Sequence, residues 1–273
     1  MNAFFKSEAD YLTMSLDGKI GLVATVDDEG EPHITFLSSI QPFGDDMMTV
    51  GEFCSGLSKR FFTERPKAGF LILSPSMEIW HGRINYAKTQ TTGAEFEMYN
   101  NKPLFRYNSY CGVGKVHYFN LHSLSSKLKL NMGALIPSAI ISRLLALVKM
   151  GKSPKILPPQ AKQLFDDIGG LKFISYLDGE GYPVITPVIQ AAPAGRGRIV
   201  FAGFPFKKEV GYIPKSVKAA ILAVNLKTES VLVKGRYCGK GIKHMDIERV
   251  YNSMPPIPGY IYPPEELKKV EVF

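Results

Sequence analysis

The sequence predicts a mainly β chain with a helical insert (α+β), built from two small, partly closed barrels that form a pseudo-dimer within one chain. Three observations predict it: a ten-residue segment that occurs twice, strand-like runs in the same order after each copy, and an ordinary globular composition. The chain has 273 residues, 45% hydrophobic and 21% charged, which excludes disordered, collagen-like and disulfide-stapled chains. At roughly 100–200 residues per domain, this length accommodates two domains.

The repeated segment has a centre rich in Asp, Glu and Gly. Residues 26–35 read VDDEGEPHIT and residues 177–186 read LDGEGYPVIT, identical at six of ten positions at an offset of 151. Each copy follows a β-prone run, at 20–25 and at 171–176, and a second β-prone run comes after the turn. Two such runs around a glycine turn are typical of a β-hairpin, so the repeat predicts one hairpin at the start of each barrel.

The same further elements follow each hairpin at nearly the same spacing. A third strand is expected at 47–50 and again at 198–201, and a basic doublet then precedes a proline by six residues. A fourth strand follows the proline, and a fifth strand contains a Gly-Arg pair. The doublets are Lys59-Arg60 and Lys207-Lys208, and the pairs are Gly82-Arg83 and Gly235-Arg236. Strands of this number and length suit a small barrel, and two copies suit a fused homodimer.

The repeat boundaries predict three parts. Residues 1–125 form the first barrel with a helical and aromatic insert from about residue 84, residues 126–160 a connecting helix and linker, and residues 161–273 the second barrel with a C-terminal extension. The apolar stretch Leu130–Met150 predicts the helix, with Pro137 in its first turn. Its longest uncharged piece has 13 residues, and a bilayer span needs about 20, so a packed helix is expected. Its apolar stripe comprises Ile140, Ile141, Leu144, Leu145 and Val148.

Charge and cysteine content bear on compartment and partners. The net charge is +8, without a run of five like charges. Three cysteines far apart, with no CxxC, fit reduced thiols, and the first residues lack a signal-peptide pattern, so a cytoplasmic location is expected. We expect a small-molecule substrate or electron donor as partner, no nucleic acid and no membrane. A further homodimer stays open.

Four features resemble the FMN-binding split-barrel superfamily, which contains pyridoxamine 5'-phosphate oxidase. They are the strand 24–26 leading into the turn 28–33, Val50-Gly51 at the end of the third strand, the doublet ahead of Arg65-Pro66, and the strand 80–83. The resemblance covers about 20–85 and, more weakly, about 171–236. It implies two split β-barrels with FMN in the groove between them, and hence a flavin-binding oxidoreductase of unknown substrate.

The resemblance also implies where the flavin binds. Its phosphate is expected just after the third strand, at Lys59 and Arg60 with help from Ser55 or Ser58, because such cations form charge-assisted bonds to phosphate. The first copy is favoured over the second because serines lie near its doublet. The candidate cofactor-binding residues are Thr35, Phe36, Ser38, Gly51, Ser55, Ser58, Lys59, Arg60, Trp80, Arg83, Lys207, Lys208 and Arg236.

Several of these candidates have a second interpretation. Trp80 packs in the core or stacks near the flavin, and Arg83 and Arg236 are structural or face the groove. The aromatic stretch 105–111 is a packed cover or a cap on the substrate side.

No residue is assigned as a catalytic acid or base. His117 and His122 are five residues apart, which directs them away from one another on a helix or a strand, so no metal site is expected. The GxGxxG, P-loop, HExxH and GxSxG motifs are absent. The arginine and histidine pattern by which the oxidase recognises its substrate is also absent, so the resemblance does not extend to that reaction. Three alternatives stay open: a non-catalytic flavin or haem carrier with His33 or His81 as axial ligand, a deazaflavin-dependent reductase, and an interaction module with an empty groove.

Overall fold

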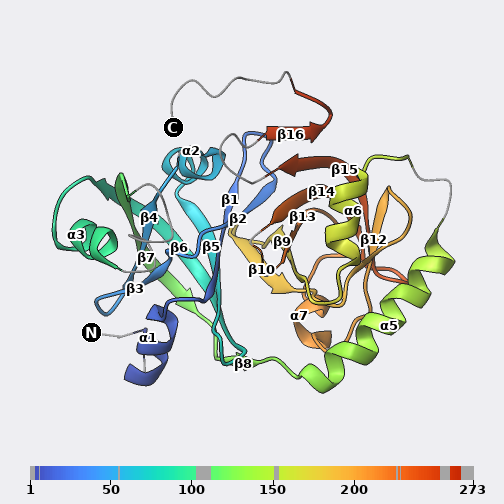
Figure 1. Ribbon diagram of the computed structural model, residues 1–273, viewed down its shortest axis with the longest axis horizontal. Helices are drawn as coiled ribbons and strands as arrows, with labels where there is room; N and C mark the ends of the chain where they lie inside the picture. The colour runs from blue at the N-terminus through green and yellow to red at the C-terminus, as the bar shows by residue number, and fades with distance from the viewer. Residues whose placement is uncertain are drawn as a thin grey trace. The chain divides into compact units, whose positions relative to one another are not determined.

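The computed structural model of the chain describes residues 4–5, 7–54, 56–102, 112–150, 154–225, 227, 229–252 and 259–265 (Figure 1). The chain divides into two units. Unit 1 consists of residues 1–28, 35–130 and 179–184, and unit 2 of residues 29–34, 131–178 and 185–273. Ser55 and the aromatic stretch 105–111 lie outside the described residues.

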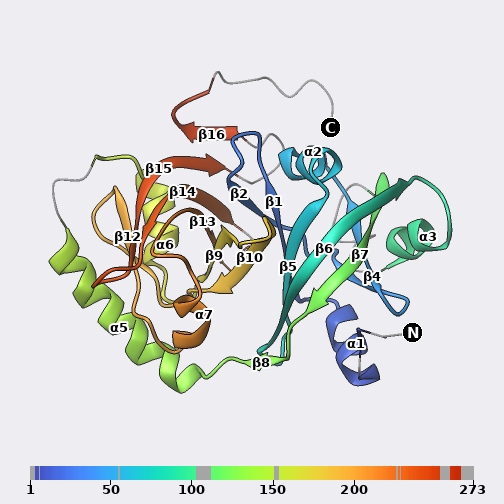
Figure 2. The same ribbon diagram turned by 180° about the vertical axis from the view of Figure 1, so that it is seen from behind.

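The first sheet has eight antiparallel strands and is not closed. Its order is β2-β1-β5-β6-β7-β4-β3, with β8 paired to β6, and Figure 2 shows β5, β6 and β7 running side by side. The strands are β1 Ile20–Val26, β2 Pro32–Phe36, β3 Gln41–Phe43, β4 Met47–Glu52, β5 Lys67–Leu73, β6 Glu78–Gln90, β7 Lys115–Leu124 and β8 Leu128–Lys129. The helices of this half are α1 Glu8–Ser15, α2 Leu57–Glu64 and α3 Ala94–Asn101.

The second sheet repeats the first, strand for strand. Its order is β10-β9-β13-β14-β15-β12-β11, with β16 paired to β15. The strands are β9 Leu171–Leu177, β10 Pro183–Pro187, β11 Ala192–Pro193, β12 Arg198–Val200, β13 Ser216–Val224, β14 Ser230–Cys238, β15 His244–Asn252 and β16 Gly259–Tyr262. The helices are α5 Met132–Lys149, α6 Pro159–Asp166 and α7 Lys207–Gly211. The prediction of a mainly β chain made of two similarly built halves is confirmed.

The two predicted hairpins form around equivalent glycines. Gly30 lies between β1 and β2 with φ 72°, and Gly181 lies between β9 and β10 with φ 80°. Glycine adopts this left-handed conformation without the steric cost that a Cβ brings. The Asp- and Gly-rich centre of the repeat therefore encodes the same turn twice.

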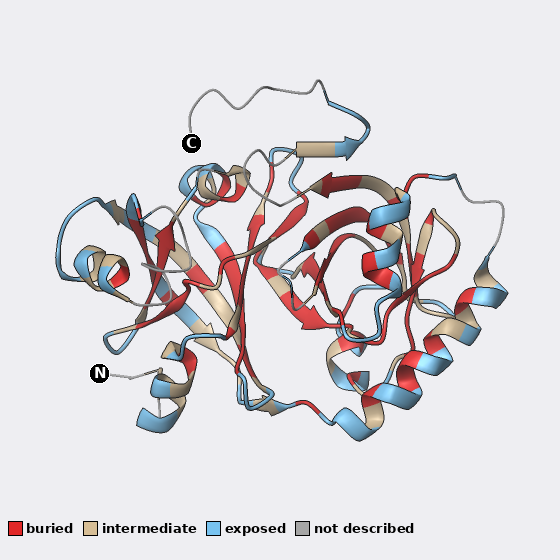
Figure 3. Cartoon of the chain, viewed as in Figure 1, coloured by how far each residue is buried: buried red, intermediate tan, exposed pale blue. Residues whose placement is uncertain are grey.

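The core of the first sheet is aromatic. Phe62 of α2, Phe70, Trp80 and Phe119 belong to one buried cluster, and Phe62 packs edge-to-face on Phe119 with ring centroids 5.0 Å apart. Figure 3 shows buried residues along the strands of both sheets. Because Phe62 lies in this cluster, α2 is fixed to the sheet immediately after its first turn.

The helix α5 differs from the prediction in its start and its orientation. Asn131 caps it by accepting a hydrogen bond from the Ala134 N–H at 3.2 Å, so Pro137 lies inside the helix, beyond its first turn. The expected packed stripe is wrong for Ile140, Ile141, Leu144 and Val148, which are exposed. Small residues form most of the opposite, buried face, and periodicity alone does not tell which face of a helix turns inward.

Unit 2 contains a buried histidine among positive charges. His33 packs edge-to-face on Tyr251 at 4.9 Å between ring centroids, and Arg249 forms ion pairs with Glu29, at 2.5 Å, and with Glu31. Burial lowers the pKa of His33 well below 6.5, and the charges of Lys234 and Arg249 lower it further. His33 is therefore neutral in the folded protein at neutral pH.

This histidine predicts that the protein loses stability as the pH falls from 7 to 5.5. In that range the unfolded chain binds a proton at His33 that the folded chain excludes, so the free energy of unfolding declines below about pH 6.5 with a slope of up to about 1.4 kcal/mol per pH unit. Urea unfolding at several pH values measures the slope. The free energy of unfolding of the variant His33→Gln should depend less steeply on pH, because this variant lacks the imidazole that binds a proton on unfolding. The other four histidines are present in both proteins. An unchanged slope in this variant would show that His33 is not responsible.

Candidate functional site

The segment that joins β4 to the first turn of α2 contains the predicted phosphate ligands that the structure brings together. Ser58, Phe61 and Phe62 form the buried face of α2, at the i, i+3 and i+4 positions of a helix that packs on a core. Gly56 precedes the helix without a side-chain cap, and the first turn contains no acidic residue. The first N–H groups of a helix have no acceptor within it and carry a partial positive charge, so this end favours an anion.

Lys59 lies in this first turn and is half-buried. Burial lowers the pKa of Lys59, and the nearby Cys54 and Glu52 only partly offset the effect. Among the residues that the structure describes, none accepts a hydrogen bond from Lys59 Nζ. A Cβ placed on Gly56 would lie 3.6 Å from this nitrogen, an ordinary contact distance, so the ammonium lies beside Gly56. A half-buried cation at a helix N-terminus has the chemistry of an anion site.

A series of hydrogen bonds holds the end of β4, which precedes α2 and Lys59 in the sequence. His117 Nε2 lies 2.6 Å from Glu52 Oε2, and His117 Nδ1 lies 2.7 Å from Thr89 Oγ1, which lies 2.8 Å from the Tyr86 hydroxyl. Burial raises the pKa of Glu52, but the His117 bond and the charges of His117, Lys59 and Lys115 outweigh it and lower this pKa overall. Glu52 is thus a carboxylate fixed in place, and these hydrogen bonds position the loop before α2.

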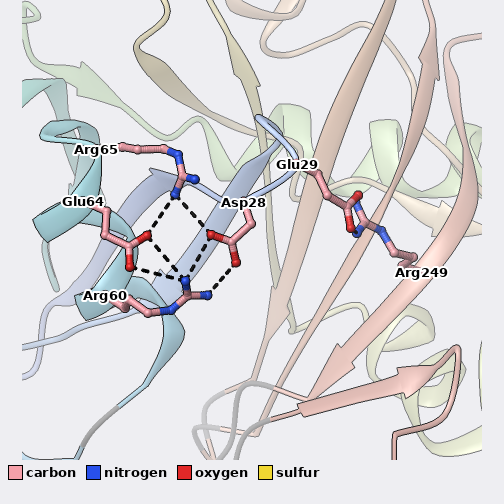
Figure 4. Close-up of polar contacts among 6 residues, drawn as sticks. All are labelled: Asp28, Glu29, Arg60, Glu64, Arg65 and Arg249. Carbon is pink, nitrogen blue, oxygen red and sulfur yellow. Dashed lines mark hydrogen bonds and ion pairs between the residues drawn. The ribbon is translucent and has the colours of Figure 1, made fainter.

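Arg60 points into a different cluster from Lys59. Its guanidinium donates two hydrogen bonds to Asp28, at 2.6 and 3.1 Å, and also reaches Glu64, while Arg65 lies 3.3 Å from Asp28 (Figure 4). The hydrogen bond from Arg60 is the main cause that lowers the pKa of Asp28. The charge of Arg60 and the hydrogen bond and charge of Arg65 lower this pKa further. Because these carboxylates pair with the Arg60 guanidinium, Lys59 is the better candidate of the two predicted phosphate cations.

The residues expected near the flavin ring fall into two environments. Thr35, Phe36 and Ser38 are half-buried at the end of β2 and just after it. Gly51 is buried, and a Cβ there would lie 3.1–3.2 Å from Val113 and Tyr99, so those side chains already fill the space beside it. Tyr99 donates to the Ser39 carbonyl at 2.8 Å and is fixed there.

Trp80 and Arg83 have structural partners within unit 1. Trp80 is 1% exposed in the aromatic core, with Lys127 Nζ 5.7 Å from its ring centroid. Arg83 donates to Glu180 at 2.8 Å and lies over the ring of Tyr182 at 5.4 Å. Both observations favour the structural interpretation of these two residues.

The second copy offers a weaker anion site. Lys207 and Lys208 are exposed, and α7 has five residues with Glu209 in its first turn. Arg236 is exposed on β14, opposite Lys218. An acidic side chain at the N-terminus opposes an anion, so the structure gives the first copy the better geometry.

Comparisons with known proteins give similarity at the level of solved structures only. No family model matches the sequence, and no curated protein does. Among the matched structures are HupZ from Group A Streptococcus (17% identity, 46% of this chain and 98% of that chain, TM-score 0.35) and an FMN-binding protein from Syntrophomonas wolfei subsp. wolfei (17%, 47% and 85%, 0.35). An F420 reductase also matches, at 13% identity over 44% of this chain and 97% of that chain, with a TM-score of 0.34. Each of these structures matches a little under half of this chain.

Sequence reasoning missed the series of hydrogen bonds that connects Glu52, His117, Thr89 and Tyr86. Glu52 and His117 are 65 residues apart and meet only because β4 pairs with β7, a strand that the repeat did not predict. Val116, Tyr118 and Phe119 are the β-prone signal that could have revealed β7. Within the described part of the chain, no three His, Cys, Asp or Glu side chains gather as metal ligands would. His33, one of the two haem-ligand candidates, is buried in unit 2.

Proposed function

We propose that the chain binds FMN through the first turn of α2 in unit 1 and acts as a flavin-dependent oxidoreductase. The half-buried Lys59 beside Gly56, in the first turn of α2, is the observation that carries this proposal. A phosphate there would accept charge-assisted hydrogen bonds from Lys59 and from the free N–H groups at the start of α2. FMN would supply reversible hydride or electron transfer, and the protein would bind and orient it.

The residues of this chain have separate roles in the proposal. Lys59 and the backbone at Ser58 hold the phosphate, while the Glu52–His117 pair fixes the strand end from which α2 starts. Phe62 fixes the other side of the helix in the core, so the first turn is held before any ligand arrives. Such preorganisation reduces the cost of ordering the site on binding. A deazaflavin with a phosphate presents the same group, so the site accommodates either ligand.

Replacing Lys59 with methionine tests the proposal. FMN affinity should fall about 10- to 100-fold, the worth of one or two charge-assisted hydrogen bonds of about 1.5–3 kcal/mol together, when followed by quenching of flavin fluorescence. Two matched controls exist in the chain. Arg60→Met removes a cation already held by Asp28 and Glu64, and Lys207→Met removes the counterpart of Lys59 in the second copy, so each should bind FMN within about threefold of the native protein. Equal affinities for all four proteins would show that the phosphate does not bind at Lys59.

The redox role has its own readout. If the protein is an oxidoreductase, adding NADH or NADPH to the FMN complex should bleach the visible flavin absorbance. Tight FMN binding with no reduction by either donor would favour the carrier alternative over the enzyme. A Soret band on addition of haem, with no uptake of FMN, would favour the haem alternative.

A further inference from the structure

The helix α5 has the reverse of the usual amphipathic arrangement. Small residues form most of its buried face, which comprises Leu135, Ser138, Ala139, Ser142 and Ala146. Large apolar residues cover the other side, namely Met132, Ile136, Ile140, Ile141, Leu144, Leu147 and Val148, with Val148 76% and Leu147 64% exposed. Figure 3 shows exposed residues recurring on successive turns of this helix. At about 100° per residue these seven side chains fall within half the circumference of the helix.

This apolar surface is held in place and faces outward. Ser142 Oγ accepts a hydrogen bond from the Ala202 N–H at 2.9 Å, and Arg143 donates to the Asp166 carbonyl at 2.5 Å. Both bonds are within unit 2, and Ala146 belongs to a small core cluster there with Ala194 and Val200. By length and composition alone α5 would be able to cross a membrane. Because one side of it is bonded to the rest of unit 2, only the outer side is available to a partner.

The positive charge of the chain is concentrated in one stretch of the sequence that includes this helix. Residues 98–165 contain ten of the 33 Lys and Arg residues and none of the 25 Asp and Glu residues. The rest of the chain therefore has two more acidic than basic residues. Within unit 2, Arg143 and Lys149 lie in α5, and Lys152 and Lys155 follow it in the sequence.

We infer that α5 binds an anionic lipid surface, lying in the plane of the membrane with its apolar side among the lipid chains. A helix with an apolar side and flanking basic residues gains both apolar burial and attraction to anionic lipids. A second copy of the chain is a poorer occupant, because pairing two α5 helices would bring two basic regions together. The inference departs from the expectation of no membrane partner, and it is independent of the proposed flavin site.

Co-sedimentation of the full chain with lipid vesicles tests the inference. The protein should bind vesicles of phosphatidylcholine with one third phosphatidylglycerol at least tenfold more tightly than vesicles of phosphatidylcholine alone, and high salt should weaken the binding. The variant Ile140→Gln/Leu144→Gln should lose at least tenfold in affinity, and its circular dichroism and thermal unfolding should stay native because both side chains are exposed. The control Leu12→Gln, which alters an exposed leucine of α1, should bind like the native protein.

Three results would overturn the inference. The first is no binding to either vesicle. The second is binding that salt abolishes but the double variant does not affect, which would indicate attraction by charge alone. The third is a native dimer in light scattering that the double variant converts to a monomer without any vesicle binding, which would make a second copy the occupant.

Discussion

Replacing Gly235 with alanine should lower the free energy of unfolding by about 2–4 kcal/mol. A Cβ on Gly235 would lie 1.9 Å from the carbonyl oxygen of Asp246 and 3.1 Å from the Cα of Ile247, both backbone atoms of β15. The pairing of β14 with β15 shifts register between Lys234 and Gly235, so the bulge brings the two backbones together there. Backbone atoms in the middle of a sheet cannot move aside without breaking ladder hydrogen bonds.

Urea unfolding followed by far-UV circular dichroism measures this loss. Gly211→Ala is the matched control in unit 2, because a Cβ at that position meets nothing within 4 Å. It should leave the unfolding free energy unchanged or raise it slightly. If Gly235→Ala unfolds within about 0.5 kcal/mol of the native protein, the close approach at the bulge does not constrain this position.

The same constraint applies in the first copy and explains the repeated Gly-Arg pair. A Cβ on Gly82 would lie 2.1 Å from the Ser123 carbonyl oxygen and 2.7 Å from the Phe70 ring, and β6 also shifts register against β7 just after this glycine. In both sheets a bulge lies within two residues of this glycine, and a Cβ there would meet backbone atoms of the neighbouring strand. The motif is therefore structural at its glycine, whatever its arginine does.

Replacing Trp80 with alanine should cost about 3–5 kcal/mol of unfolding free energy, the usual loss for a large aromatic residue removed from a core. Trp80 is 1% exposed and packs in the cluster of Val23, Phe70 and Ile72. Its fluorescence, which reports on this site alone because the chain has one tryptophan, should be that of a buried indole and should shift to the red on unfolding.

A milder variant separates the core role from flavin stacking. Trp80→Phe keeps an aromatic ring in the core, so the protein should fold with a smaller loss of stability and bind FMN as tightly as the native chain. A drop in FMN affinity of tenfold or more in a folded Trp80→Phe protein would instead mean that the indole contacts the cofactor.

The sequence predicted those parts of the fold that local signals encode. Both hairpins formed where an Asp- and Gly-rich turn separates β-prone runs, because a turn and two strands are specified by neighbouring residues. The strands β7 and β15 complete the sheets but share no motif, so comparing the two copies did not reveal them. The face of α5 that packs inward was also not predictable from periodicity, since small residues rather than large ones provide the close fit.

In the candidate site too, the parts that depend on residues distant in the sequence were not predicted. The resemblance to the split-barrel superfamily implied Lys59 as a phosphate ligand, and the structure places it in the first turn of a helix. Arg60, its neighbour in sequence, lies with Asp28, 32 residues away in the chain, which no local pattern encodes. The Glu52–His117 pair depends on strand pairing over 65 residues and was likewise not accessible from the sequence alone.

The affinity of the native protein for FMN compared with riboflavin tests the account most directly. The two ligands differ only in the phosphate, and that phosphate is the group that Lys59 and the start of α2 are proposed to hold. Titration of each flavin by fluorescence quenching at one ionic strength should give at least about tenfold tighter binding of FMN, or about 1.4 kcal/mol. Equal affinities for FMN and riboflavin, or binding of neither, would contradict a phosphate site at α2.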